Sequence, residues 1–127
     1  MVDWYGVTDL ASVSDRPDPG LPGDPQDATS PEAALIGGAP ADRPKAVRLA
    51  SPLTHVGAGA APVLIQHGTA DRIVPFKQAE ELLAAYQAAG VPAEMDRIEG
   101  ADHCFWGVET APILPRAIAF LKARLGA

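Results

Sequence analysis

Cysteine is almost absent from this sequence, which holds a single one, Cys104, among its 127 residues. One cysteine excludes an intrachain disulfide, so the fold must be held by packing and hydrogen bonds alone. No apolar run approaches the roughly 18 residues that a membrane span needs. Residues 1–6 contain neither a basic segment nor a long apolar one, so no secretion signal is visible and a cytoplasmic location is the expectation.

Basic residues are also few. Lysine and arginine number 10 against 16 aspartates and glutamates, which gives a formal net charge of −6. A chain of this sign repels a phosphate backbone, so we expect no nucleic-acid partner. The hydrophobic content of 47% is enough to fill one core in a single compact domain, and the 20% of charged residues does not indicate disorder.

Proline is concentrated in one stretch rather than spread along the chain. Because proline fixes φ and lacks an N–H donor, that stretch cannot hold a long helix or a central strand. We expect an excursion over residues 16–61 with short helices at 31–36, after Ser30, and at 44–49. It is either a flexible linker or a lid over a site, and its apolar residues favour the lid. Those expected anchors are Leu35, Ile36, Val47 and Leu49.

From residue 62 the pattern becomes regular. The apolar run at 63–66, stopped by His67 and Gly68, predicts a parallel strand buried on both faces. Residues 76–89 predict an amphipathic helix that ends at Gly90, and residues 93–98 predict a second strand. A last helix is expected over about 115–125. Its inward-facing residues are predicted to be Ile118, Leu121 and Leu125.

The helix over 76–89 has two distinct faces. The face predicted to pack on the sheet holds Phe76, Ala79, Leu82, Leu83 and Tyr86. The face predicted to meet solvent holds Lys77, Gln78, Glu80, Glu81 and Gln87. Strand, helix, strand and helix at this spacing form a right-handed unit with parallel strands. With a short strand over residues 2–5, the predicted class is α/β, with about three parallel strands and flanking helices.

Parallel strands end at the same edge of a sheet, where α/β proteins gather their ligands and catalytic groups. Asp71 follows the first of the two later strands, and His103 follows the second. Neighbouring strands lie about 4.8 Å apart, so the two side chains can form a hydrogen bond. A carboxylate on Nδ1 leaves Nε2 free to act as a base. From position alone, each residue could equally be a helix cap or a surface group.

The local sequences around these residues resemble a known family. Residues 67–75 (HGTADRIVP) resemble the H-G-x-x-D-x-x-V-P segment that bears the acid of α/β-hydrolases, and residues 100–106 (GADHCFW) resemble the histidine loop. Residues 51–56 (SPLTHV) and 3–10 (DWYGVTDL) are similar to the segments that precede them in esterases and lipases related to hormone-sensitive lipase and feruloyl esterase. Prolyl-oligopeptidase-like enzymes share these loops. The four segments occur in family order.

This resemblance implies the C-terminal half of a hydrolase. Asp71 and His103 would be the acid and the base of a Ser-His-Asp triad that cleaves a small-molecule ester without a cofactor. Phe105 and Trp106 would line the acyl or alcohol pocket, although core packing explains them equally. The chain would begin at the sixth of eight strands. The implied division is a strand and turn at 1–15, a lid-like excursion at 16–61 and the later unit at 62–127.

The nucleophile of the family is missing from these residues. None of Ser12, Ser14, Ser30 and Ser51 lies in a G-x-S-x-G turn, and no H-G-G oxyanion segment is present. We therefore expect no activity from this chain alone. It is either a carboxylesterase fragment, or one subunit of a two-chain hydrolase whose N-terminal half is another chain, or a non-catalytic truncated product or binding module. A peptidase or lactonase remains open.

Other residues near the acid and the histidine have simpler interpretations. Cys104 is adjacent to His103 but is expected to be a small packed hydrophobe rather than a nucleophile. The spacing of Asp71, Asp102, His103 and Cys104 matches no common metal site, so no metal is predicted. His55 and His67 are expected to be structural. The strand over residues 2–5 should lie at an edge of the sheet with apolar surface exposed.

Overall fold

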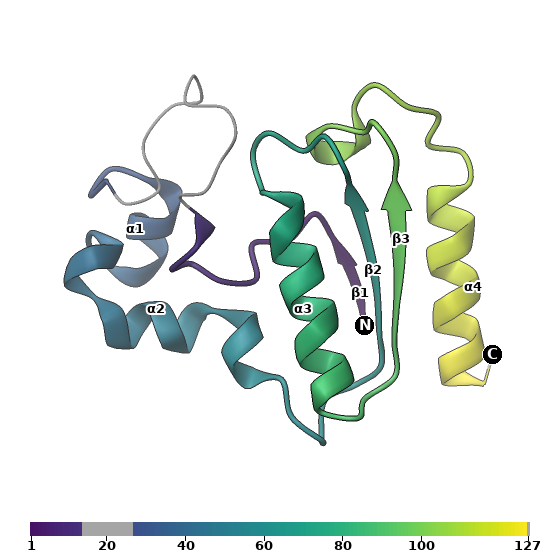
Figure 1. The fold of residues 1–127 in the computed structure, drawn as a ribbon, viewed down its shortest axis with the longest axis horizontal. Helices are drawn as coiled ribbons and strands as arrows, with labels where there is room; N and C mark the ends of the chain where they lie inside the picture. The colour runs from purple at the N-terminus through teal and green to yellow at the C-terminus, as the bar shows by residue number, and fades with distance from the viewer. Residues whose placement is uncertain (14–26, 127) are drawn as a thin grey trace.

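The sheet has three parallel strands in the order β1 (Val2–Trp4), β2 (Val63–Gly68) and β3 (Ala93–Ile98), as Figure 1 shows. The computed structural model describes residues 1–13 and 27–126, so part of the predicted excursion lies outside the described residues. The α/β class with parallel strands is confirmed. The strands begin and end within two residues of the predicted positions. None of the helices in the described ranges is both long and apolar enough to cross a membrane.

Helices cover both faces of β2, which is buried along its whole length. Val63 and Ile65 pack against α3 (Phe76–Ala88), whereas Leu64 packs against α4 (Ile113–Leu125). Successive side chains of a strand point to opposite faces, so α3 and α4 lie on opposite sides of the sheet. Each of these buried aliphatic side chains contributes about 1.5–3 kcal/mol to stability. The resulting three layers hold the carboxyl ends of β2 and β3 in place.

A row of polar side chains crosses the sheet and helps to fix its register. Trp4, Gln66 and Asp96 are partners in adjacent strands. Trp4 Nε1 donates to Gln66 Oε1 at 2.7 Å, and Gln66 Nε2 donates to Asp96 Oδ2 at 2.9 Å. The buried glutamine thus satisfies both ends of its amide, which a one-residue slip of either neighbour would prevent.

The face that α4 presents to the sheet differs from the prediction. Ile118, Leu121 and Leu125 are 43%, 37% and 78% exposed, so their predicted inward orientation is wrong. The buried residues are Ile113, Ala117 and Phe120, because the helix carries two adjacent apolar stripes and this one packs on the sheet. The second stripe lines an open apolar groove of about 260 Å³ beside β1. The groove residues are Val2, Trp4, Leu114, Ala117, Ile118 and Leu121.

Gln78, predicted to face solvent, is 1% exposed. Its Oε1 accepts hydrogen bonds from the backbone N–H groups of Thr8 and Asp9 at 2.7 and 2.8 Å. Its Nε2 donates to the Asp9 carbonyl at 2.8 Å and to Ser12 Oγ at 3.1 Å. The prediction was wrong because it placed no segment over this side of α3. The glutamine attaches the segment after β1 to the helix.

The described part of the excursion consists of short helices, as predicted. These are α1 (Pro31–Ile36), the 3-10 helix η2 (Pro40–Asp42), α2 (Pro44–Ala50) and the 3-10 helix η3 (Pro52–His55). In Figure 1, α1 and α2 lie beyond α3, on the side away from α4. Val47 is buried, but Leu35 and Leu49 are 70% and 65% exposed and are not the anchors that we expected.

Hydrogen bonds, rather than the predicted leucine anchors, attach the excursion to the segment that follows β1. Ser51 Oγ accepts from Leu10 N at 3.0 Å, and Leu53 N donates to the Thr8 carbonyl at 2.9 Å. Ser30 caps α1 through a bond from Ala33 N at 3.0 Å. The lid function of residues 16–61 stays a prediction.

Candidate active site

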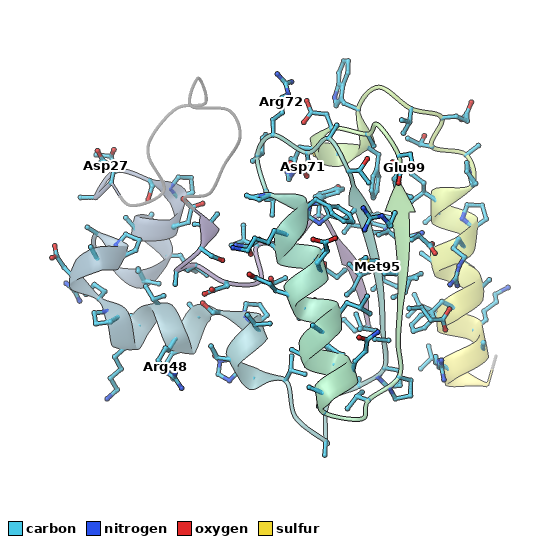
Figure 2. The ribbon with its side chains drawn as sticks, viewed as in Figure 1. Asp27, Arg48, Asp71, Arg72, Met95 and Glu99 are labelled. Atoms are coloured by element: carbon cyan, nitrogen blue, oxygen red, sulfur yellow. The ribbon has the colours of Figure 1, made fainter. Side chains whose placement is uncertain are left out.

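The loops that follow β2 and β3 meet at one edge of the sheet. Gly68 and Ile98 are partners in register, so the two strands end at the same level. Beyond them, Ala70 N donates to the Ala101 carbonyl at 3.0 Å. Figure 2 shows Asp71 and Arg72 above the carboxyl ends of these strands, with Glu99 at the end of β3. We refer to the two segments as the acid loop (69–75) and the histidine loop (99–107).

Asp71 and His103 form the predicted hydrogen bond. His103 Nδ1 lies 2.9 Å from Asp71 Oδ2, and this geometric prediction is confirmed. The carboxylate can only accept, so the imidazole nitrogen that faces it carries the proton. In neutral His103 the unprotonated nitrogen is then Nε2. The His103 side chain is 22% exposed and that of Asp71 is fully buried, so a substrate can reach the histidine but not the acid.

Asp71 is held by four donors. Its Oδ1 accepts from the backbone N–H groups of Ile73 and Val74, both at 2.8 Å. Its Oδ2 lies 3.3 Å from His67 Nε2 in addition to its bond with His103. Burial raises the pKa of Asp71, but the bonds from His67, Val74, His103 and Ile73 outweigh it and lower that pKa below its ordinary value. The group is therefore an anion at neutral pH.

His67 supports this carboxylate from within the core. It is 0% exposed, and its ring lies edge-on to Phe76. Its Nε2 is 3.0 Å from the Val74 carbonyl and 3.3 Å from Asp71 Oδ2. Both partners are acceptors, so Nε2 carries the proton. The structural role predicted for His67 is confirmed, and its contact with Asp71 is an addition that spacing alone did not indicate.

Gly68 permits the close approach of the two loops. A Cβ at this position would collide with the backbone carbonyl of Ala101, which cannot move without shifting the histidine loop. We expect Gly68→Ala to destabilise the chain by about 1–3 kcal/mol, the range for overpacking a rigid site. Urea unfolding would measure this loss. Gly59→Ala is the matched control, because a Cβ there meets open space, and equal unfolding midpoints for the two variants would contradict the prediction.

The histidine loop contains left-handed backbone at residues other than glycine. Cys104 and Phe105 have φ of 58° and 60°, and Tyr5, at the end of β1, has φ of 44°. Such conformations cost about 1–3 kcal/mol each and concentrate at functional sites. The turn leaves Cys104 exposed, so its expected role as a small packed hydrophobe is wrong. The Tyr5 ring lies edge-on to His103, with centroids 4.7 Å apart.

Phe105 and Trp106 occupy different environments. Phe105 is 7% exposed and packs against the rings of Tyr5 and Trp4, at centroid distances of 5.0 and 6.0 Å. Trp106 is 78% exposed, and its backbone N–H donates to the His103 carbonyl at 3.3 Å. Contact of either ring with a substrate stays a prediction.

The described serines have structural partners elsewhere. Ser12 bonds to Gln78, Ser30 caps α1, and Ser51 Oγ donates to the Val47 carbonyl at 2.7 Å. Ser14 lies outside the described residues. No cluster of three or more potential metal ligands occurs within residues 1–13 and 27–126.

A parallel sheet with an aspartate and a histidine on the loops at its carboxyl edge is the arrangement of the C-terminal part of an α/β-hydrolase. The BD-FAE family model matches residues 1–86, which is more than half of the chain. The chain therefore belongs to the BD-FAE family.

Solved structures support the same class. A truncated form of a carbohydrate esterase from gut microbiota is 32% identical, with a TM-score of 0.83 over 99% of this chain. A bifunctional GH43-CE protein from Bacteroides eggerthii is 31% identical, with a TM-score of 0.80 over 97%. A puromycin-hydrolysing peptidase from Mycobacterium tuberculosis is 26% identical, with a TM-score of 0.75 over 98%. This chain spans 42%, 16% and 18% of their lengths respectively.

Proposed function

We propose that this chain supplies the acid and the base of a carboxylesterase that uses a Ser-His-Asp triad. The observation that carries the proposal is the 2.9 Å contact between Asp71 Oδ2 and His103 Nδ1 at the carboxyl edge of the sheet. In this reaction a serine hydroxyl attacks the ester carbonyl, and His103 Nε2 takes its proton and passes it to the leaving alcohol. Asp71 stays ionised and stabilises the imidazolium. Water then releases the acyl group by the same route.

The serine of this triad would come from polypeptide outside the 127 residues, either in a longer form of the protein or in a separate chain. The serines Ser12, Ser30 and Ser51 are engaged in structural bonds, and no serine of the sequence lies in G-x-S-x-G. In the described sheet β1 pairs with β2 alone, so its other edge can take a further strand. The apolar groove beside β1 would receive the covering helix or strand.

The proposed substrate is a small ester carried on a carbohydrate. One of the structural neighbours, at 32% identity, is a truncated carbohydrate esterase. Amide cleavage is the second candidate, favoured by the puromycin-hydrolysing peptidase at 26% identity. Phe105 and Trp106 are proposed to contact the acyl or alcohol part, and Trp106, whose backbone bonds to the His103 carbonyl, is exposed.

Complementation tests the proposal. The chain would be mixed with an N-terminal half of a BD-FAE esterase that carries G-x-S-x-G and the oxyanion loop, and hydrolysis of p-nitrophenyl acetate would be followed. We expect no hydrolysis by either part alone and hydrolysis by the complex, because the site is assembled from loops that need docking and not covalent continuity. Acetylated xylooligosaccharide and an aminoacyl anilide would separate ester from amide cleavage. A stable complex without any hydrolysis would refute the proposed function.

The groove beside β1 is expected to be the docking surface for that half. Ile118→Glu or Leu121→Glu should weaken association about a hundredfold, because each would bury an unpaired carboxylate against apolar surface. Isothermal titration calorimetry with the N-terminal half would measure the loss. Leu125→Glu is the matched control, since Leu125 lies on the same helix, is 78% exposed and does not line the groove. Equal affinities of the three variants would exclude this docking surface.

A further inference from the structure

One carboxylate connects the loops that carry Asp71 and His103. Asp102 Oδ1 accepts a hydrogen bond from the backbone N–H of His103 at 2.8 Å and a second from the N–H of Arg72 at 3.0 Å. The first amide belongs to the histidine itself, and the second follows Asp71 directly in the chain. A single oxygen atom therefore holds two peptide groups together: the one that precedes the His103 side chain and the one that follows Asp71.

The Arg72 side chain holds the second oxygen of this carboxylate. Its Nε and Nη2 lie 2.6 and 2.5 Å from Asp102 Oδ2, so two guanidinium nitrogens donate to the same carboxylate oxygen in a charge-assisted contact. The Arg72 side chain is the largest cause that lowers the pKa of Asp102 to about 2, followed by the two backbone amides. Asp102 is therefore charged at any pH at which the pair could act.

Other bonds between the loops lie nearer the strand ends. Ala70 N donates to the Ala101 carbonyl at 3.0 Å, and Gly100 N donates to Thr69 Oγ1 at 2.9 Å. The bonds of Asp102 reach farther, to the level of Asp71 and His103. A change of about 1 Å in the position of a catalytic group can lower a rate about a hundredfold. A hydrogen-bonded link beside Asp71 and His103 therefore has more effect on their geometry than one at the strand ends.

We propose that Asp102, held by Arg72, is a positioning residue that keeps the Asp71 carboxylate in register with His103 Nδ1. This inference rests on the proposed function of the pair. Asp102 itself does not touch the reacting atoms: its oxygens are occupied by the two backbone amides and the guanidinium. The alternative is that it caps only the short 3-10 helix η4 (His103–Phe105).

Histidine tautomers distinguish the two roles. The chain has three histidines, so ¹⁵N-histidine labelling gives few signals. We expect neutral His103 to carry its proton on Nδ1, and Asp102→Ala to shift a large share of it to Nε2 as the Asp71 bond lengthens. Asp102→Asn should retain most of the Nδ1–H form, because its amide oxygen can still accept from both backbone amides.

His55 is the internal control for this experiment. It lies in η3, outside both loops, with its Nε2 2.9 Å from the Leu49 carbonyl, so its signals should not change in a folded variant. If Asp102→Ala alters the His55 signals, Arg72→Ala replaces it, since that change removes the guanidinium contact with Asp102 and keeps the backbone N–H bond to Asp102 Oδ1. We expect Arg72→Ala to shift His103 in the same direction by a smaller amount.

Activity of the complemented enzyme gives the second measurement. Asp102→Ala should lower kcat about ten- to a hundredfold with little change in KM, because the carboxylate does not bind substrate. A folded Asp102→Ala variant with an unchanged His103 tautomer and unchanged kcat would overturn the positioning role. An inactive wild-type complex with the expected tautomer shifts would instead refute the esterase and leave the positioning role standing.

Discussion

Replacing His103 with alanine should lower kcat of the complemented enzyme about 10⁶-fold, the order found when a triad histidine is removed from a serine hydrolase. The serine hydroxyl then has no base at neutral pH and remains a weak nucleophile. The large effect follows from the geometry, since the 2.9 Å bond to Asp71 holds the proton on Nδ1 and leaves Nε2 as the basic nitrogen. Initial rates on p-nitrophenyl acetate would measure it.

Cys104→Ser is the control for this variant. Cys104 is exposed and adjacent to His103, so it is the alternative nucleophile that the sequence offers. We expect the serine variant to retain kcat within about twofold, because the cysteine has no assigned role in proton transfer. Loss of activity in Cys104→Ser with retention in His103→Ala would mean that the triad assignment is wrong.

Replacing Asp71 with asparagine should lower kcat about 10⁴-fold, which is the known size of the effect when the triad acid becomes an amide. The amide oxygen must take the place of Oδ1, because Ile73 N and Val74 N both donate there. Its NH₂ group then faces His103 Nδ1. That nitrogen becomes an acceptor, the proton moves to Nε2, and the base is lost. A ¹⁵N spectrum of His103 would show the reversed tautomer.

The same variant should change how stability depends on pH. The folded pKa of Asp71 lies below its ordinary value of 3.8, so the folded state binds the proton more weakly than the unfolded state. The stability from its four bonds is fully present above that ordinary value and is lost as pH falls through the lower folded pKa. Urea midpoints between pH 5 and pH 2 should therefore fall less steeply in Asp71→Asn. An identical slope would contradict the four-donor site.

Local patterns predicted the part of the fold nearest the proposed site. The apolar run of β2, the breaker pair His67–Gly68 and the periodicity of α3 are features of short segments. A strand buried on both faces, or a helix buried along one stripe, needs apolar residues at fixed spacings, so its burial can be predicted from the segment itself. The Asp71–His103 contact was predicted from the positions of the two residues, because neighbouring parallel strands end at one edge of the sheet. Its catalytic role remains a proposal.

Predictions of burial failed where the outcome depended on more than the residue types within one segment. α4 carries two apolar stripes, and the packing of Ala117 and Phe120 on Leu64 selected one while the groove left the other open. Gln78 has the polarity of a surface residue, yet the segment at Thr8 and Asp9 covers it. Cys104 has the size of a core residue, yet a left-handed turn leaves it exposed. No local pattern contains the partner of α4 or of Gln78, or the backbone conformation of Cys104.

The sequence by itself determined the order and type of the elements, because periodicity, proline and glycine act within a few residues of one another. It also determined that an acid and a histidine follow adjacent strands. The tertiary structure alone decided which stripe of α4 is buried, and it brought the Asp102 carboxylate to both loops. Those outcomes depend on contacts between residues 30 or more positions apart, which only the packed sheet brings together.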